Sequence, residues 1–247
     1  MVMRIRAISL DLDDTLWPIA PVMLRAEERL DAWLRGNCPE AARHFPILAM
    51  RALRERISAE HPHLSHDFTA QRMLSLRAAL TPHGYGDEHV EQAFAEYYAA
   101  RNDVELYPDA LAGLERLAAR FPLVSISNGN ADLERIGLAR FFRHSLTSRS
   151  IGIAKPAPEI FQAACAYLEL PPDAVLHVGD DPELDVAGAR AAGLRCAWLN
   201  RASDGLASVA PISAHPISAD LTVRDLHELA DLLDALAVSD GAPTALA

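Results

Sequence analysis

The sequence predicts an α/β fold: a Rossmann-like, doubly wound parallel sheet with an inserted helical-bundle cap. Three observations predict it. Short, continuously apolar runs, typical of parallel strands buried on both faces, recur along the chain. Amphipathic segments of helical period separate most of these runs. One long stretch without a strand pattern follows the first strand, which divides the chain into a core (residues 1–17 and 104–247) and a cap (residues 18–103).

The first strand is expected over residues 5–10 and ends at Asp11. Four helical segments follow, each bounded by residues that stop a helix, and they are expected at residues 21–36, 40–60, 67–81 and 87–101. Because no strand pattern occurs among them, this block is predicted to form a compact helical bundle. The hinges between bundle and core are expected at residues 18–21 and near Asn102-Asp103.

Strands and helices alternate again after Pro108. Further strands are expected at residues 123–127, 174–178, 195–199 and near 217–219. The accompanying helices are expected at residues 109–120, 131–139, 157–169, 183–192 and 224–237. The tail from Ser239 to Ala247 is expected to be loose, as chain ends commonly are.

Composition and charge narrow the class of protein. The chain has 247 residues, with 34 acidic and 23 basic side chains and a formal net charge of −11 at pH 7. This balance, without a basic tract, argues against nucleic acid as a partner. No apolar run approaches the roughly 20 residues that a membrane-spanning helix needs, which argues against a membrane partner. The three cysteines are scattered, as is typical of free thiols in a reducing compartment, so a cytoplasmic protein is expected.

Polar side chains follow the predicted strands at the ends where parallel sheets bind ligands. In chain order they are Asp11, Asp13 and Thr15, then Ser127 and Asn128, then Lys155, and finally Asp180, Asp181 and Asp185. Lys155 is the single lysine among the 23 basic residues. Because the carboxyl ends of the strands meet at one edge of the sheet, we expect these side chains to converge there.

Crowded carboxylates repel one another unless cations lie between them. Lys155, a compact point charge, supplies one cation. A hard divalent ion such as Mg²⁺ prefers oxygen ligands and is the natural second cation, with Asp11 and Asp180 as its best side-chain ligands. Such a site would neutralise a phosphate dianion, so a small phosphorylated metabolite is the expected ligand.

The two-residue spacing of Asp11 and Asp13 places both on one side of an extended strand end. Asp11 can then attack phosphorus to form an aspartyl-phosphate, while Asp13 protonates the leaving alcohol and later activates water. Ser127 and the backbone N–H of Asn128 can hold the phosphoryl oxygens, and Lys155 can stabilise the charge on them. This set of residues predicts phosphoryl transfer.

Each motif also has a purely structural interpretation. Ser127-Asn128-Gly129 could be a turn, and Gly179-Asp180-Asp181-Pro182 could be a loop with an N-cap. The joint occurrence of the motifs, each after an expected strand, favours catalysis. His177, within a strand, is expected to be buried and hydrogen-bonded. Tyr97 is expected to be a packing residue of the bundle, whereas Trp17, directly after the first loop, could contact the site.

These segments resemble the four motifs of the haloacid dehalogenase superfamily: DLDDTL at 11–16, Ser127, Lys155, and GDDPELD at 179–185. The resemblance implies a Rossmann-like core, a helical (subclass I) cap between the first two motifs, and Mg²⁺ as cofactor. The roles that it implies are nucleophile and metal ligand for Asp11, general acid/base and backbone-carbonyl ligand for Asp13, phosphate binding for Ser127 and Lys155, metal binding for Asp180, and support for Asp181 and Asp185.

Dehalogenases of this superfamily lack an aspartate at the position of Asp13, so its presence implies a phosphatase, a phosphoric monoester hydrolase. Residues 11–28, 127–142, 155–164 and 176–198 are similar to bacterial flavin-pathway phosphatases, which act on 5-amino-6-(5-phospho-D-ribitylamino)uracil and on flavin mononucleotide (FMN). This likeness implies a role in riboflavin biosynthesis. Alternatives are a phosphatase for a sugar phosphate, a nucleotide or phosphoglycolate, a phosphomutase, a 2-haloacid dehalogenase, and a non-catalytic phosphoryl-accepting switch. A monomer or a homodimer is expected.

Overall fold

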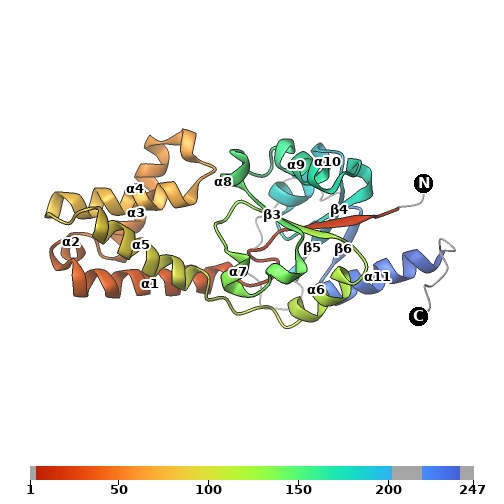
Figure 1. The fold of residues 1–247 in the computed structure, drawn as a ribbon, viewed down its shortest axis with the longest axis horizontal. Coiled ribbons are helices and arrows are strands. Elements are labelled where there is room, and N and C mark those ends of the chain that lie inside the picture. Colours follow the sequence, from red (N-terminus) through yellow and green to blue (C-terminus); the bar gives the residue numbers. More distant parts are fainter. Residues whose placement is uncertain (1–3, 202–218, 240–247) are drawn as a thin grey trace.

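The computed structural model describes residues 4–201 and 219–239. Its core is a six-stranded sheet of order β3-β2-β1-β4-β5-β6, in which every neighbouring pair is parallel (Figure 1). The strands are β1 (Ala7–Leu10), β2 (Leu123–Ser127), β3 (His144–Thr147), β4 (Val175–Gly179), β5 (Arg195–Leu199) and β6 (Leu221–Val223). The predicted Rossmann-like fold is confirmed. Because β1 lies between β2 and β4, the residues that follow these three strands meet at one edge.

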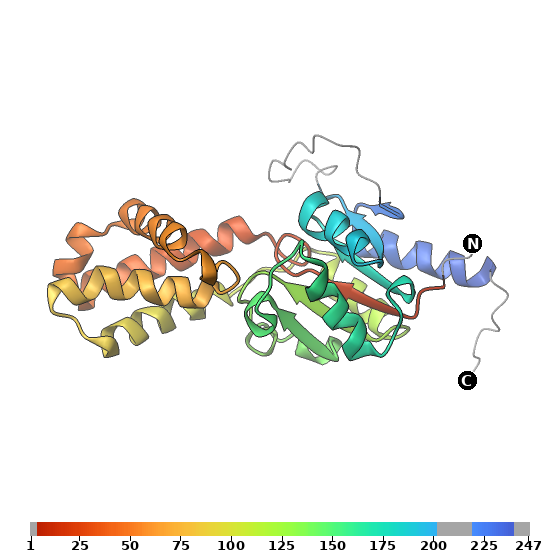
Figure 2. The ribbon, with the colours of Figure 1, turned by 90° about the horizontal axis from the view of Figure 1, so that it is seen from above.

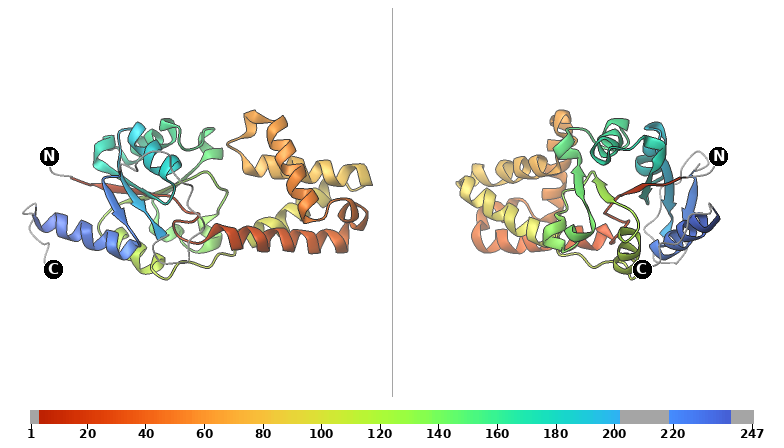
Figure 3. Two further views of the ribbon diagram at one scale, coloured as in Figure 1. Left: turned by 180° about the vertical axis from the view of Figure 1, so that it is seen from behind. Right: turned by 45° about the vertical axis from the view of Figure 1, so that its right-hand side comes forward.

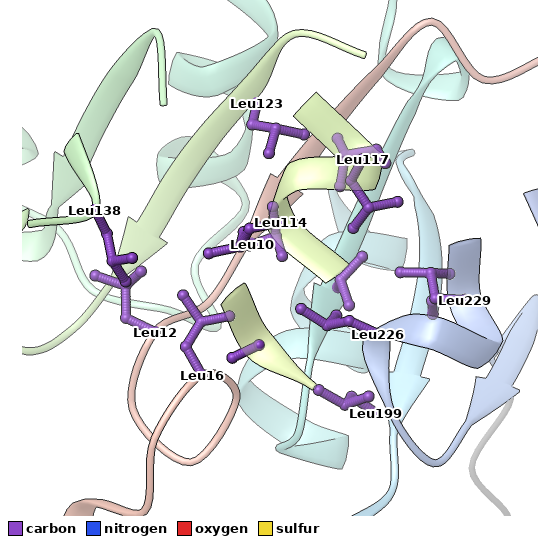
Figure 4. Close-up of a cluster of buried hydrophobic side chains, with 14 of the residues drawn as sticks. Leu10, Leu12, Leu16, Leu114, Leu117, Leu123, Leu138, Leu199, Leu226 and Leu229 are labelled. Carbon is purple, nitrogen blue, oxygen red and sulfur yellow. The ribbon is translucent and has the colours of Figure 1, made fainter. Parts of the chain in front are cut away.

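Helices cover both faces of the sheet (Figures 1 and 3). The core helices are α6 (Ala110–Ala118), α7 (Leu133–Ile136), α8 (Ser148–Ile151), α9 (Pro158–Leu168), α10 (Gly188–Ala191) and α11 (Leu226–Ser239). One hydrophobic cluster joins α6 and α11 to the sheet, and Figure 4 shows its leucines. A second cluster joins α9 and α10 to the opposite face. Burial on both faces explains why the central strands read as continuous apolar runs.

The helices between residues 19 and 101, the segment predicted as the cap, lie at one end of the molecule, beside the sheet edge (Figure 2). They are α1 (Ile19–Asn37), α2 (Pro39–His44), α3 (Ile47–Glu60), α4 (Phe68–Leu80) and α5 (Asp87–Arg101), with short 3₁₀ turns at Pro62–Leu64 and Thr81–His83. They enclose a hydrophobic cluster of their own. No helix in the described part of the chain is both long and apolar enough to cross a bilayer.

Four local expectations were wrong. The segment 40–60 is two helices, because Pro46 and the extended backbone before α3 separate α2 from α3. β3 was missed because an edge strand with the sequence HSLT lacks an apolar run. The helix expected at 183–192 begins with a π-helical turn at Pro182–Ala187. The last strand is Leu221–Val223 and not 217–219, of which residues 217 and 218 lie outside the described residues.

The expected loose tail overlaps the described chain only at Ser239, which ends α11. Residues 240–247 lie outside the described residues.

Candidate active site

The loop after β1 is held tightly against the sheet. The backbone N–H of Asp11 donates to the Val178 carbonyl at 2.9 Å, so the residue that follows β1 is still bonded to β4. Asp14 adopts a left-handed backbone with φ of 57°, and its carboxylate accepts from the N–H of Ile19 at 2.9 Å. This reverses the chain at once into α1. The loop therefore presents Asp11 and Asp13 at a fixed place on the sheet edge.

Lys155 lies between two carboxylates in the interior of the site. Its Nζ is 2.5 Å from Oδ1 of Asp11 and 2.6 Å from Oδ1 of Asp185, and the residue is only 5% exposed. The side chain of Asn128 fixes the backbone of Lys155 from both sides, donating to its carbonyl at 3.0 Å and accepting from its N–H at 2.7 Å. β2 and the Lys155 segment are thus joined by this amide.

Asp185 collects donors from three directions. Besides Lys155, it faces Nε2 of His177 at 3.0 Å and accepts from the backbone N–H of Asp181 at 3.1 Å. His177 is fully buried, and its Nδ1 lies 2.9 Å from the hydroxyl of Ser9. The expectation that His177 is buried and hydrogen-bonded is confirmed. Asp185 is accordingly well placed to orient Lys155 from behind.

The charges at this site do not cancel. Burial raises the pKa of Asp11 to about 7, opposed by Lys155 and reinforced by Asp185. Burial, Asp11 and Asp185 raise the pKa of Asp180 to about 8. The pKa of Asp185 is lowered, because the contacts with Lys155 and His177 outweigh its burial. Burial opposes the charge of Lys155, but the two carboxylates beside it raise its pKa. Two buried carboxylates and the half-buried carboxylate of Asp180 thus share one ammonium, which favours an additional cation.

A metal ion could bind at three of these carboxylates. Asp11, Asp180 and Asp185 each offer one oxygen, and the three oxygens lie within 4.8 Å of one another. The hydroxyl of Thr15 donates to Asp180 at 3.0 Å, and Trp198 donates to the Asp180 carbonyl at 2.9 Å, which fixes that residue. An all-oxygen donor set with surplus negative charge suits a hard divalent cation.

Asp181 plays a different part from its neighbour. One carboxylate oxygen accepts from the backbone N–H groups of Glu183 and Leu184, both at 2.8 Å. It therefore caps the π-helical turn, which is the N-cap role that the sequence left open.

Asp13 faces the cap. Nη2 of Arg101, the last residue of α5, lies 2.8 and 2.7 Å from the two carboxylate oxygens of Asp13. The indole N–H of Trp17 donates to the same carboxylate at 2.8 Å, so Trp17, whose role the sequence left open, contacts a predicted site residue. Gly129 lies against this pair, because a Cβ there would be 2.6 Å from Asp13 Oδ2. Ser127 accepts from the N–H of Gly129 at 2.9 Å.

Arg101 was missed by the sequence reasoning. It is 2% exposed. Among the buried side-chain nitrogen and oxygen atoms of the described residues, its Nη1 is the one without a hydrogen-bond partner. The signal that could have found it is its position, since it directly precedes the expected hinge at Asn102-Asp103 and so returns to the sheet edge.

The cap and the core enclose a cavity of about 570 Å³ over the sheet edge. On the hinge side, the N–H of Asp132 donates to Asn102 at 2.7 Å. On the far side, the hydroxyl of Ser148 donates to the His66 carbonyl at 2.7 Å and Asn130 donates to the hydroxyl of Thr69 at 3.2 Å. The predicted site residues that line the cavity are Asp11, Asp13, Ser127, Asn128, Lys155, Asp180, Asp181 and Asp185. The cap side adds Arg54, Phe68, Gln71, Arg72, Tyr97 and Arg101.

Comparison with known proteins agrees with this geometry. Residues 5–193 match the model of the haloacid dehalogenase-like hydrolases. The chain is 34% identical over 203 residues to the 5-amino-6-(5-phospho-D-ribitylamino)uracil phosphatase YigB of Escherichia coli K12, covering 79% of this chain and 84% of YigB. It is 36% identical over 159 residues to a phosphoserine phosphatase of Thermus thermophilus, covering 62% of this chain and 61% of that protein.

A solved structure described as a 2-haloacid dehalogenase from Pseudomonas syringae superposes with a TM-score of 0.82. It is 34% identical and covers 94% of this chain and 99% of that chain. The family match and the curated relatives, taken with the acidic sheet edge, are consistent with the motifs of the sequence. The chain belongs to the haloacid dehalogenase-like hydrolases and is a phosphatase of that family.

Proposed function

We propose that the protein hydrolyses a phosphate monoester through an aspartyl-phosphate on Asp11. The observation that carries this proposal is the position of Asp11, buried at the end of the central strand, in contact with Lys155 and at the floor of a cavity. A carboxylate oxygen of Asp11 attacks phosphorus, and the bond from phosphorus to the ester oxygen breaks. Water then attacks the phosphoryl group and releases inorganic phosphate, which returns Asp11 to its carboxylate.

Asp13 is proposed as the general acid and base of both steps. It gives a proton to the departing alcohol and later takes one from the attacking water. Its contacts with Arg101 and Trp17 support this assignment, because they fix both carboxylate oxygens at the cavity wall. Ser127 and the backbone of Asn128 are proposed to hold the phosphoryl oxygens, and Lys155 to stabilise their charge.

Mg²⁺ is the proposed cofactor, held by Asp11, Asp180 and the backbone carbonyl of Asp13. The close carboxylate oxygens of Asp11 and Asp180 and the unbalanced negative charge support this choice. When bound, the ion would screen the carboxylates from the incoming phosphate. Asp185, although near, already has three donors and is proposed to position Lys155 instead, with Thr15 and Asp181 supporting the loops.

The substrate proposed first is 5-amino-6-(5-phospho-D-ribitylamino)uracil or FMN, since YigB is a relative over most of both chains. A role in riboflavin biosynthesis would follow. Other small phosphates remain the alternative class, and a phosphomutase or a phosphoryl-accepting switch is less favoured because Asp13 is present.

We further infer that residues 18–103 form a cap domain on a core of residues 1–17 and 104–247. Location in the cytoplasm and a monomeric or homodimeric state stay predictions.

One substitution tests the mechanism directly. Asp11→Asn should abolish phosphate release from p-nitrophenyl phosphate while the thermal unfolding temperature stays near that of the unchanged protein. Asp173→Asn is the matched control and should retain activity, because the Asp173 carboxylate is exposed and does not line the cavity. Activity of the Asp11 variant equal to that of the control would exclude Asp11 as the nucleophile.

Dehalogenation is the second candidate, favoured by the P. syringae structure. Asp13 argues against it, because halide leaves without a proton. Release of chloride from 2-chloropropionate, with no phosphate released from any monoester offered, would replace the proposed reaction with this one.

A further inference from the structure

Arg72 of α4 is a buried cation on the cap side of the cavity. It is 3% exposed and lines the cavity that also contains Asp11 and Lys155. Within the described residues, no carboxylate oxygen lies within 4.0 Å of its guanidinium. Burying an unpaired charge is costly, so a buried arginine usually has an anionic partner. The cap therefore holds a cation at the cavity that has no carboxylate partner among the described residues.

Glu27, the acidic group of the cap whose charge acts on Arg72, is already engaged. Glu27 pairs with Arg51, at 2.7 Å from Nε, and with Arg54, at 3.3 Å from Nη1. Burial lowers the pKa of Arg72 and Arg54 adds to this effect, whereas Tyr97 and, more weakly, Glu27 oppose it. On the opposite, core side of the cavity, Lys155 already pairs with Asp11 and Asp185.

The orientation of Arg72 is fixed by an aromatic ring. Its guanidinium carbon lies 4.1 Å from the centroid of the Tyr97 ring, which is a cation–π stack. This contact holds the guanidinium beside the ring, and its N–H groups still need hydrogen-bond acceptors. A fixed planar edge of donors matches a planar edge of two adjacent acceptors, as an ammonium group does not.

We propose that Arg72, stacked on Tyr97, forms a subsite that binds a planar, two-acceptor edge on the leaving group of the substrate. A carboxylate presents such an edge, and so does a flavin-type ring, in which a carbonyl oxygen and a ring nitrogen lie side by side. This inference rests on the proposed phosphatase reaction and names the leaving groups that it accepts. Arg72 is then a specificity residue, since the phosphoryl group is bound at the opposite, acidic wall.

Two matched substrate pairs test the subsite. The first is phenyl phosphate and 4-carboxyphenyl phosphate, and the second is ribitol 5-phosphate and FMN. Within each pair, the selectivity is kcat/KM for the acceptor-bearing substrate divided by kcat/KM for the plain one. Arg72→Met should lower the selectivity of at least one pair by about tenfold or more, the worth of a charge-assisted hydrogen bond. The pair that responds identifies the acceptor as carboxylate or ring edge.

An arginine elsewhere in the cap provides the control. Arg56 of α3 is 64% exposed, pairs with Glu60 at 3.7 Å and does not line the cavity, so Arg56→Met should keep both selectivities within about twofold. Arg72→Lys retains the charge but not the planar edge, and it should lose selectivity as the methionine variant does. It also serves if Arg72→Met does not fold.

The outcomes separate the two proposals. Selectivities unchanged in both Arg72 variants, or preserved in full by lysine, would overturn the subsite while leaving the phosphatase intact. The subsite would also be overturned, and the phosphatase retained, if the unchanged protein hydrolyses phenyl phosphate and ribitol 5-phosphate but neither 4-carboxyphenyl phosphate nor FMN. If the unchanged protein releases phosphate from none of the four substrates, the phosphatase reaction itself is overturned.

Discussion

The cavity has a core wall, which contains Asp11, Lys155 and Asp180, and a cap wall, which contains Arg72 and Tyr97. The two walls carry an excess of opposite charge. On the core wall, Lys155 contacts two carboxylates, and a third carboxylate lies beside them, so negative charge is in excess. On the cap wall, Arg72 is buried with no carboxylate within 4.0 Å among the described residues. The core wall is suited to a cation and a phosphate, whereas the cap wall is suited to an acceptor on the leaving group. This contrast separates the chemistry, held by the sheet, from the choice of substrate, held by the helices.

The largest effect is expected on the core wall. Lys155→Met removes the ammonium that contacts both Asp11 and Asp185, so phosphate release should fall by about 10²- to 10³-fold. Lys155→Arg should restore little, because a planar fork replaces a compact charge. The measurement is kcat with p-nitrophenyl phosphate at saturating Mg²⁺. Activity of the methionine variant close to that of the unchanged protein would mean that the core wall does not depend on its ammonium.

The junction of the two walls should show a smaller effect. Arg101→Met leaves Asp13 without the guanidinium that contacts both its oxygens, so kcat/KM should fall about tenfold. Arg25→Met is the control, because Arg25 of α1 is exposed and, among the described residues, its hydrogen bond is to the Asp103 carbonyl at 2.9 Å. Equal activity of the two variants would show that the arginine is a structural part of the hinge.

Metal binding should stabilise the core wall in a pH-dependent way. Asp11 and Asp180 have folded pKa values raised to about 7 and about 8, so without a cation the protein loses stability as the pH rises from the ordinary carboxyl range up to these values. Bound Mg²⁺ would relieve the repulsion between the two carboxylates. At a pH below their pKa values, the ion would first have to displace the protons that they carry. The rise in unfolding temperature on adding Mg²⁺ should therefore be larger at pH 8 than at pH 6. An equal rise at both pH values would contradict the assignment of these ligands.

The smallest effect concerns a core ion pair outside the cavity. Asp109 accepts from Arg201 at 2.8 and 3.0 Å and from the N–H of Leu226 at 2.8 Å. These bonds outweigh its burial and lower its pKa. A lowered folded pKa stabilises the protein above the ordinary carboxyl range, and this contribution is lost as the pH falls through it. Asp109→Asn should cost about 1–2 kcal/mol of unfolding free energy at pH 7 and less at pH 3. A constant cost would contradict the ion pair.

The sequence predicted that the polar residues of the core wall converge, because several of them stand where strands end. Asp11, Ser127 and Asp180 are found where β1, β2 and β4 end, and adjacent parallel strands must bring such ends together. Strand β3 was not predicted, because an edge strand need not be apolar.

The cap wall could not be predicted in the same way. Arg72 and Tyr97 belong to different helices, and their stacking depends on how α4 packs against α5. Helical periodicity indicates which face of each helix is apolar, but not which residues of two helices meet. Tyr97 does pack in the bundle, as expected, yet it also lines the cavity.

The central claim, that the core wall carries a nucleophilic carboxylate, can be tested by trapping the intermediate. Asp13→Asn should slow the attack of water, so the protein mixed with p-nitrophenyl phosphate and quenched in acid should accumulate a covalent adduct. Mass spectrometry of the digested protein should then find one phosphoryl group on Asp11, and none in the Asp11→Asn, Asp13→Asn double variant. A phosphoryl group on another residue, or hydrolysis by the Asp13 variant without any adduct, would contradict the account.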